Sequence, residues 1–153
     1  MRKAAIVALL ALVSCFNDAE APSPDMPEHT AHAGCLEVGV ERVSDRRAHA
    51  DQVPLAITFQ NQCGVAVEVD LRKLDVEGEG PEGRRALHAY DPRLSMHPGR
   101  LDPRQRAEER LAFGPIDASY TRVCIDPSHA DVAHVQQPAG VVCLDVPPPR
   151  DAP

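Results

Sequence analysis

Alternation of apolar and polar residues over short stretches is the feature that most limits how this chain can fold. Leu36, Val38 and Val40 are separated by acidic residues or glycine. A strand presents alternate residues to opposite faces, whereas an amphipathic helix repeats its apolar residues about every 3.6 positions. The pattern therefore predicts a β-strand at about 35–43 with one buried face.

The same pattern recurs along most of the chain. Leu55, Ile57 and Phe59 predict a second strand at about 53–61. Further runs lie at 65–71, 74–76, 86–90, 111–113, 121–125 and 142–146. About seven strands separated by turn residues predict a single all-β sandwich over residues 35–146.

A resemblance supports this architecture. The stretch Ile57-Thr-Phe-Gln-Asn61 leading into Gly64-Val-Ala-Val67 is similar to the B–C region of small immunoglobulin-like modules on bacterial surfaces. The resemblance implies an immunoglobulin-like sandwich, although the central Trp of antibody domains is absent because the chain has no Trp. It implies nothing about activity, since one fold supports many functions.

Four breaks in the alternation call for local explanations. The apolar phase slips after Leu71, which predicts a bulge near Arg72 and Lys73. Gly and Pro at 78–83 predict a turn, and residues 97–103 are expected to form a loop. Asp102-Pro103-Arg104-Gln105 has the form of a helix start, with an Asp cap, a Pro at the first position and a Gln at the third.

Five cysteines divide into one near the N-terminus and four in the predicted sandwich: Cys35, Cys63, Cys124 and Cys143. No C-x-x-C motif occurs, and an even number favours two disulfides in an exported chain. If the first two strands pair antiparallel, the pairing brings Cys35 near Cys63. Cys124 and Cys143 both lie opposite the apolar faces of their strands. The preferred pairs are therefore Cys35–Cys63 and Cys124–Cys143.

The N-terminus has the pattern of an export signal over residues 1–14. Met1-Arg2-Lys3 is basic, and the apolar run 4–13 is too short to span a bilayer core of about 30 Å. The sequence Leu12-Val13-Ser14-Cys15 then resembles the lipobox of bacterial lipoproteins. This resemblance implies cleavage before Cys15, lipid on Cys15 and anchoring in the cell envelope. Phe16 at the next position implies the outer membrane rather than retention in the inner one.

Two other interpretations of the N-terminus stay open. The first is cleavage of an ordinary signal peptide, which requires small residues at positions −3 and −1 relative to the cleaved bond. Cleavage after Ala19 places Asn17 at −3, and cleavage after Ala21 puts Pro22 first. The second interpretation is that the N-terminal segment forms a buried helix.

Residues 15–34 are expected to form a flexible tether, because Pro, Glu, Ser and Ala dominate there without an apolar period. His29 and His32 lie in this segment as H-x-x-H, which lacks the further ligands and fixed geometry of a metal site. The Pro-rich end at 147–153 is expected to be an extended tail.

Composition excludes some functions. The net charge of −7 argues against nucleic acid as a partner, since phosphate contacts need clustered positive charge. The chain has no G-x-S-x-G, H-E-x-x-H or phosphate-binding glycine motif, so we expect no catalytic residues and no cofactor. The expected function is a non-catalytic binding or accessory module, held at the membrane by lipid, with an envelope protein as a possible partner.

The alternative function is envelope copper or zinc binding. Copper sites combine His with Met or Cys, and the candidates here are His88, Met96, His97, His129 and His134. Convergence of three or more of them would favour this alternative, whereas scattered surface histidines need no metal.

Arginine is dense at 84–110, a segment that contains seven arginines and four acidic residues. Guanidinium groups suit carboxylate, phosphate or sulfated ligands, so this segment could be a docking face. The competing interpretation is a solvated region in which neighbouring acids neutralise the arginines.

Overall fold

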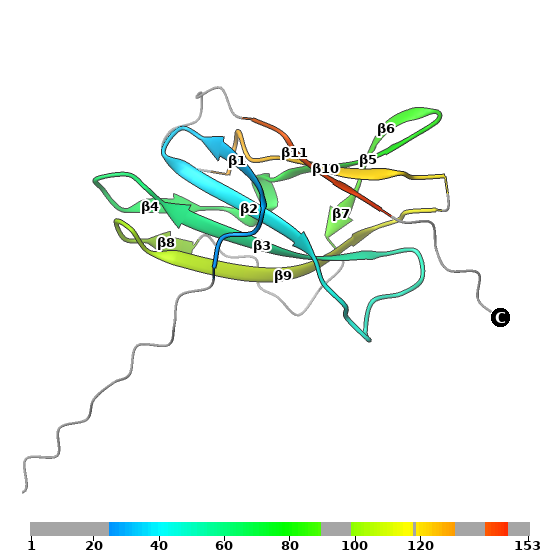
Figure 1. The fold of residues 1–153 in the computed structure, drawn as a ribbon, viewed down its shortest axis with the longest axis horizontal. Coiled ribbons are helices and arrows are strands. Elements are labelled where there is room, and N and C mark those ends of the chain that lie inside the picture. Colours follow the sequence, from blue (N-terminus) through cyan, green and yellow to red (C-terminus); the bar gives the residue numbers. More distant parts are fainter. Residues whose placement is uncertain (1–24, 90–98, 118, 131–139, 147–153) are drawn as a thin grey trace, which may run out of the picture.

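The apolar faces of the alternating runs pack against one another in the computed structural model, which describes residues 25–89, 99–117, 119–130 and 140–146. The described chain is all-β, with antiparallel pairing throughout (Figure 1). Its elements are β1 His29–Ala33, β2 Leu36–Arg42, β3 Val53–Asn61, β4 Val67–Val69, the 3-10 turn η1 Leu71–Lys73, β5 Asp75–Gly80, β6 Gly83–Ala86, β7 His88–Ala89, β8 Gly99–Leu101, β9 Arg106–Gly114, β10 Arg122–Asp126 and β11 Val142–Asp145. Within the described ranges, no helix is long and apolar enough to cross a membrane.

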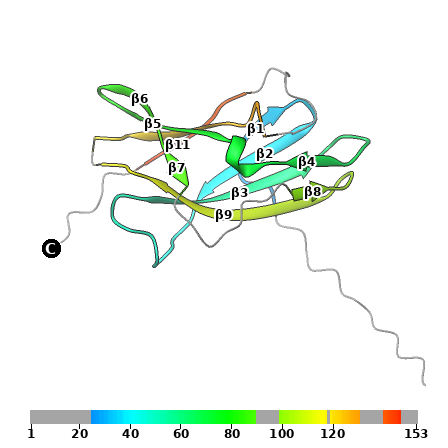
Figure 2. The same ribbon diagram turned by 180° about the vertical axis from the view of Figure 1, so that it is seen from behind.

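Two larger sheets and one strand pair make up the described part of the chain. One sheet has five strands in the order β1-β2-β3-β9-β7, and the other has four in the order β11-β10-β5-β6. β4 and β8 form a separate pair at one end of the molecule (Figures 1 and 2). The immunoglobulin-like strand topology stays a prediction.

The core is built from the inward residues of both larger sheets. Val38, Ile57 and Leu111 of the five-stranded sheet are buried together with Val123 and Ile125 of the four-stranded sheet. These are apolar positions of the alternating runs, so the sequence pattern predicted their facing correctly. β3 is also buried on its other side at Ala56 and Thr58.

Both preferred disulfides are formed. Cys35 joins Cys63 with the two Cα atoms 5.1 Å apart, just beyond the β2–β3 ladder. Cys124 joins Cys143 with the Cα atoms 4.1 Å apart, and these residues lie directly opposite each other on β10 and β11. Each disulfide therefore crosslinks two strands that are already neighbours.

The predicted tether, 15–34, is wrong at its C-terminal end. Residues 29–33 form β1, which pairs with β2, and Ala31 and Ala33 are buried there. The apolar alternation of this strand is weak because alanine carries little apolar surface. Gly34, with a φ of 60°, makes the turn into β2. Residues 15–24 and the predicted tail lie outside the described ranges.

The predicted bulge near Arg72 and Lys73 is also wrong. Residues 71–73 form η1, through which the chain passes from β4 to β5 in the four-stranded sheet. The phase of the alternation changes because the chain changes sheet. Val65, the first residue of the predicted run 65–71, is 60% exposed.

The expected helical turn at Asp102-Pro103-Arg104-Gln105 is instead a tight turn between β8 and β9. The Gln105 side chain accepts from the Asp102 backbone N–H at 2.8 Å, as in a capping box, yet Arg104 has a φ of 67° and no helix follows. A positive φ after Pro is the geometry of a type II turn. The loop expected at 97–103 is wrong in part, because 99–101 form β8.

Buried Asn61 holds this turn in place. Its Nδ2 donates to the carbonyl oxygens of Val65 and Leu101, both at 2.9 Å, and its Oδ1 accepts from the Cys63 N–H at 2.8 Å. Its backbone N–H donates to the Gln105 carbonyl oxygen at 3.0 Å, and its carbonyl oxygen accepts from the Arg104 N–H at 2.8 Å. One amide side chain therefore ties the segment after β3 to the turn before β9.

The run at 86–90 divides between two sheets. β6 ends at Ala86, Leu87 is buried, and β7 then pairs with β9 in the five-stranded sheet (Figure 2). The described chain contains eleven strands rather than about seven, because short strands such as β6 and β7 lie where one run was expected.

Candidate functional site

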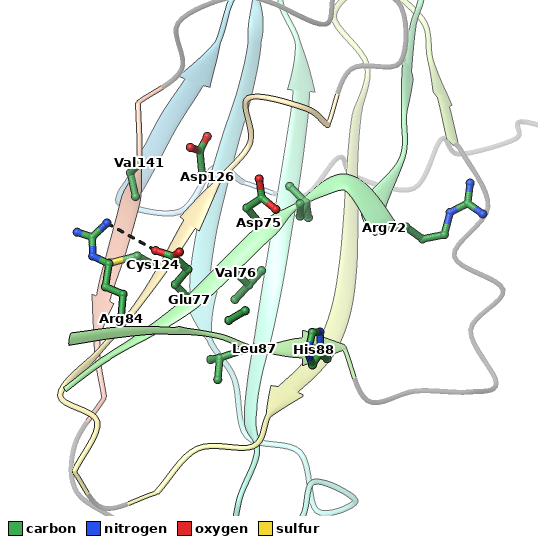
Figure 3. A pocket seen from close by; sticks show the side chains of 12 residues that line it. Arg72, Asp75, Val76, Glu77, Arg84, Leu87, His88, Cys124, Asp126 and Val141 are labelled. Carbon is green, nitrogen blue, oxygen red and sulfur yellow. Dashed lines mark ion pairs between the residues drawn. The ribbon is translucent and has the colours of Figure 1, made fainter. Parts of the chain in front are cut away.

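A pocket of about 350 Å³ lies on the outward face of the four-stranded sheet (Figure 3). The strands there turn Val76, Val123 and Ile125 into the core, so the alternate residues face outward. The charged and ionisable residues that line the pocket are Arg72, Asp75, Glu77, Arg84, His88 and Asp126. Leu87, Cys124 and Val141 add apolar surface.

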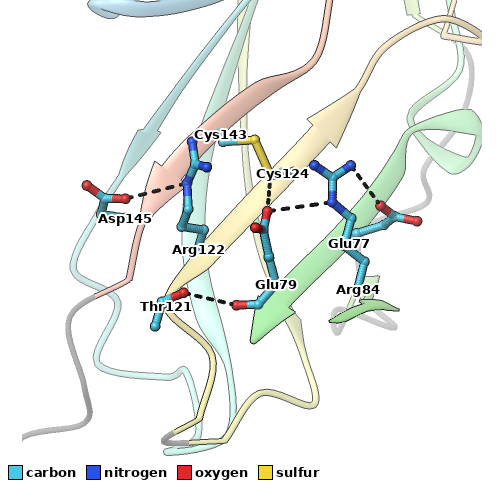
Figure 4. A network of polar contacts seen from close by, with 8 residues as sticks. All are labelled: Glu77, Glu79, Arg84, Thr121, Arg122, Cys124, Cys143 and Asp145. Carbon is cyan, nitrogen blue, oxygen red and sulfur yellow. Dashed lines mark hydrogen bonds and ion pairs between the residues drawn. A yellow bond between two sulfur atoms is a disulfide. The ribbon is translucent and has the colours of Figure 1, made fainter. Parts of the chain in front are cut away.

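A row of alternating charges crosses the same face beside the pocket (Figure 4). Asp145, Arg122, Glu79 and Arg84 lie opposite one another on β11, β10, β5 and β6. Arg122 Nε is 3.6 Å from Asp145 Oδ1, and Arg84 Nε is 3.5 Å from Glu79 Oε2. Such exposed pairs contribute up to about 1 kcal/mol each, so the row fixes side-chain positions more than it stabilises the fold.

The Cys124–Cys143 disulfide lies next to this row. Glu79 Oε2 is 3.8 Å from Cys124 Sγ, a contact rather than a hydrogen bond because a disulfide sulfur carries no proton. The β5 residue directly opposite Cys124 is Glu77, whose carboxylate is 3.7 Å from Arg84. The pocket wall at Cys124 is thus covalently tied to the next strand.

Two aspartates that line the pocket are cross-strand partners. Asp75 and Asp126 are directly opposite on β5 and β10, an arrangement that like charges disfavour. Asp75 Oδ2 is 3.4 Å from His129 Nδ1, and Asp126 Oδ1 accepts from the Ser128 N–H at 2.9 Å. Neither has an ion pair with a described Lys or Arg. Chemically, this pair suits a positively charged group.

A third aspartate, Asp70, positions Arg72, which lines the pocket. Asp70 is buried, and its carboxylate oxygens accept two hydrogen bonds from the Arg72 guanidinium, both at 2.8 Å. The bonds from the Arg72 side chain hold the pKa of Asp70 below its usual value, against the raising effect of burial. Asp70 also accepts from the Arg72 backbone N–H at 3.1 Å and so caps η1.

The predicted metal ligands are only partly within the described chain. His88 lines the pocket and His129 contacts Asp75, whereas Met96, His97 and His134 lie outside the described residues. His29 and His32 are exposed and three positions apart on β1, so they point to opposite faces. In the described ranges, no three His, Cys, Asp or Glu residues are grouped so that they could hold a metal ion.

The arginines of 84–110 are largely paired with acids. Arg84 contacts Glu77 and Glu79, while the others that form ion pairs are Arg85, Arg100 and Arg110. Arg106 donates to Gln60 at 3.0 Å. These ion pairs fit the interpretation in which neighbouring acids neutralise the arginines better than the one in which the segment is an open docking face.

Two features of the surface were missed from the sequence. The Asp75–Asp126 pair depends on the β5–β10 register, which no local pattern gives. The second is a set of exposed arginines, Arg42, Arg46 and Arg47, at the β2–β3 loop. The available signal is their closeness in sequence, with three arginines within six residues.

Cys15 and the signal-like segment lie outside the described ranges. Comparison of the chain with protein-family models, with curated proteins and with solved structures found no match, so its function is inferred from its own residues.

Proposed function

We propose that this protein is a lipid-anchored component of the bacterial cell envelope whose β-sandwich is a non-catalytic binding or accessory module. Residues 1–14 are the export signal, Cys15 is the lipid attachment site, and the outer membrane is the favoured location. The observation that carries the proposal is the pair of disulfides, Cys35–Cys63 and Cys124–Cys143. Disulfides persist in oxidising compartments such as the periplasm and the cell surface.

The lipid, rather than overall charge, supplies the attachment. Removing residues 1–14 removes Arg2 and Lys3, so the net charge of −7 becomes −9. Such a body is repelled on average by an anionic membrane. Each buried methylene of an acyl chain contributes about 0.8 kcal/mol, and two or more chains give stable anchoring.

The pocket on the four-stranded sheet is the proposed binding surface. It combines a wall made rigid by the Cys124–Cys143 disulfide with the paired carboxylates of Asp75 and Asp126. These features suit recognition of a positively charged group on a partner.

Mass spectrometry of the protein from its own membranes tests the proposal. An acylated mass beginning at Cys15, which grows by four hydrogens on reduction, would support the anchor and both disulfides. A partner retained under native conditions would support the binding role, and its loss in Asp75→Asn/Asp126→Asn but not in Asp102→Asn would place it at the pocket. An unacylated mass beginning elsewhere contradicts the anchor.

Envelope metal binding is the second candidate, favoured by one observation. His88 lines the pocket, and His129 contacts Asp75, which lines it too. Titration with Zn²⁺ or Cu²⁺ tests it. Binding that disappears in His88→Ala/His129→Ala and persists in His49→Ala would support this candidate, and no binding at all would remove it.

A further inference from the structure

The loop between β2 and β3 carries unpaired positive charge in an otherwise acidic chain. We call residues 42–52 the arginine loop. Arg42, Arg46 and Arg47 are exposed, and none has an ion pair with a described carboxylate. By contrast, the described arginines that form such pairs are Arg72, Arg84, Arg85, Arg100, Arg110 and Arg122.

Two acids, Asp45 and Asp51, lie within the arginine loop against its three arginines, which leaves the loop a net charge of +1. The Asp45 side chain is engaged with the backbone. Asp45 Oδ1 accepts from the Arg47 N–H at 2.8 Å, and the Asp45 carbonyl accepts from the Ala48 N–H at 3.2 Å. The His49 backbone N–H donates to Gln52 Oε1 at 3.1 Å, and the Gln52 backbone N–H donates to the His49 carbonyl oxygen at 3.0 Å. These bonds order the backbone. Arg42 and Arg46 line an open hollow of about 570 Å³, and Arg47 is exposed as well.

The arginine loop lies close to where the chain enters the described structure. Met26 and Pro27 lie against the outward side of Gly39, and His29 is opposite Val40 on β2. Arg42 is two residues beyond Val40, or roughly 7 Å along the strand. Figure 1 shows the loop projecting beyond the end of β2.

The length of the preceding chain limits how far the arginine loop can be from the lipid. Cys15 precedes Asp25 by ten residues. Ten residues span at most about 35 Å when fully extended. A lipid on Cys15 therefore keeps the membrane surface within reach of the arginine loop.

We propose that Arg42, Arg46 and Arg47 contact the phosphate groups of anionic phospholipids in the membrane that holds Cys15. This inference rests on the proposed lipid anchor. Guanidinium groups match phosphate geometry with two parallel hydrogen bonds. The outward face of the four-stranded sheet carries Asp75, Glu77, Glu79, Asp126 and Asp145 against Arg84 and Arg122, and an anionic surface repels that face. The arginine loop is then the membrane-facing side of the domain.

Tryptophan fluorescence tests this orientation without interference, because the chain has no Trp. Ala50→Trp places a reporter in the arginine loop, and Ala86→Trp places one on β6; both alanines are exposed. Acylated protein is inserted into vesicles of phosphatidylethanolamine and phosphatidylglycerol that contain a headgroup-spin-labelled lipid. We expect strong quenching of the Ala50→Trp protein and weak quenching of the Ala86→Trp protein.

Removing the arginines should release the loop. Arg42→Gln/Arg46→Gln/Arg47→Gln should lower the equilibrium constant for loop contact roughly fivefold per arginine, since each basic side chain near an anionic surface contributes about that factor. Arg100→Gln/Arg104→Gln/Arg122→Gln removes the same charge elsewhere and should leave quenching unchanged.

Several results would overturn the inference. They are equal quenching at the two reporters, quenching unaffected by the three substitutions in the loop, or equal quenching on phosphatidylcholine alone. A loop reporter that responds to inorganic phosphate and not to vesicles would overturn the lipid assignment. The anchor fails separately, since a protein without acyl groups shows an unmodified mass and does not float with phosphatidylcholine vesicles.

Discussion

Asn61 shows how much one buried amide can determine locally. Its Nδ2 donates to two carbonyl oxygens, those of Val65 and Leu101. Asn61→Asp would turn an oxygen toward both carbonyls and bury a charge. We expect a loss of about 3 kcal/mol or more in the free energy of unfolding, measured by urea denaturation.

A neighbouring substitution provides the control for Asn61. Gln62 is exposed, and its amide donates only to the Glu37 side chain among the side-chain contacts described. Gln62→Glu should cost about 1 kcal/mol or less. Similar losses for the two variants would contradict the role assigned to Asn61.

The Asp70–Arg72 pair makes stability depend on pH. Because the pKa of Asp70 is lowered by its bonds to Arg72, the ionised carboxylate stabilises the fold above the ordinary aspartate pKa. This contribution is lost as pH falls below about 4 through the lower folded value. Asp70→Asn should therefore be less stable than the native chain at pH 7 by about 1–3 kcal/mol.

The difference should shrink as the solution is acidified, which thermal melting from pH 7 to 2.5 would measure. A constant difference across that range would show that the loss is one of packing rather than charge. Asp102→Asn, at an exposed pair, is the matched control and should change little at any pH.

At the scale of residues, the sequence predicted which side chains face the core but not which polar groups meet. Leu55, Ile57 and Phe59 are all buried because each strand's alternation is a local property. The contact between Asp75 and His129 joins residues 54 positions apart, so it depends on how strands are ordered across the sheet.

Among the elements, β1 depends on a glycine. A Cβ at Gly39 would lie 2.4 Å from Pro27 Cδ, which is too close for two carbon atoms that are not bonded to each other. Gly39→Val should displace the segment before β1 and destabilise the fold by about 1–3 kcal/mol. Limited proteolysis before His29 should become faster.

Gly64→Ala is the control, because a Cβ there meets nothing within 4 Å. It should change stability by no more than about 0.5 kcal/mol. If both variants are cut at the native rate, the segment before β1 does not depend on close packing at Gly39.

The strands were predictable to very different degrees. Residues 53–61 were predicted in full because a nine-residue strand carries several alternations. β8 has only three residues and follows a segment without a period, so nothing local marked it. At 102–105 the capping side chain was recognised correctly, but the left-handed backbone at Arg104 directs the chain into β9 instead of a helix.

For the whole molecule, the disulfides should decide whether the fold survives reduction. They close separations of 28 and 19 residues, and loops of that size contribute about 3 kcal/mol each. The sum is comparable to the whole stability of many domains. We expect reduction to lower the melting temperature sharply, as followed by circular dichroism.

Single disulfide removals separate the two contributions. Cys35→Ala/Cys63→Ala and Cys124→Ala/Cys143→Ala should each lose about half of the effect of reduction. An unchanged melting temperature in reductant would mean that the sandwich is stable without crosslinks, and it would weaken the argument for an oxidising compartment.

The all-β class and the disulfide pairing followed from the sequence because alternation and cysteine facing are local. The sheet to which each strand belongs did not follow from the sequence. The chain changes sheet at η1, where the pattern predicts a bulge, and again at Leu87, where it predicts one short strand. Which sheet a short strand joins is decided by packing across the core rather than by its own residues.

The Cys35–Cys63 disulfide has a mechanical consequence. A pulling force applied at the N-terminal end reaches β1 first, at His29, and can peel its ladder from β2 one pair at a time. The peeling stops at Cys35, because the covalent link passes the load directly to the segment after β3. Residues 25–35 can thus be drawn out under load to a length of at most roughly 35 Å while β2 and β3 keep their register.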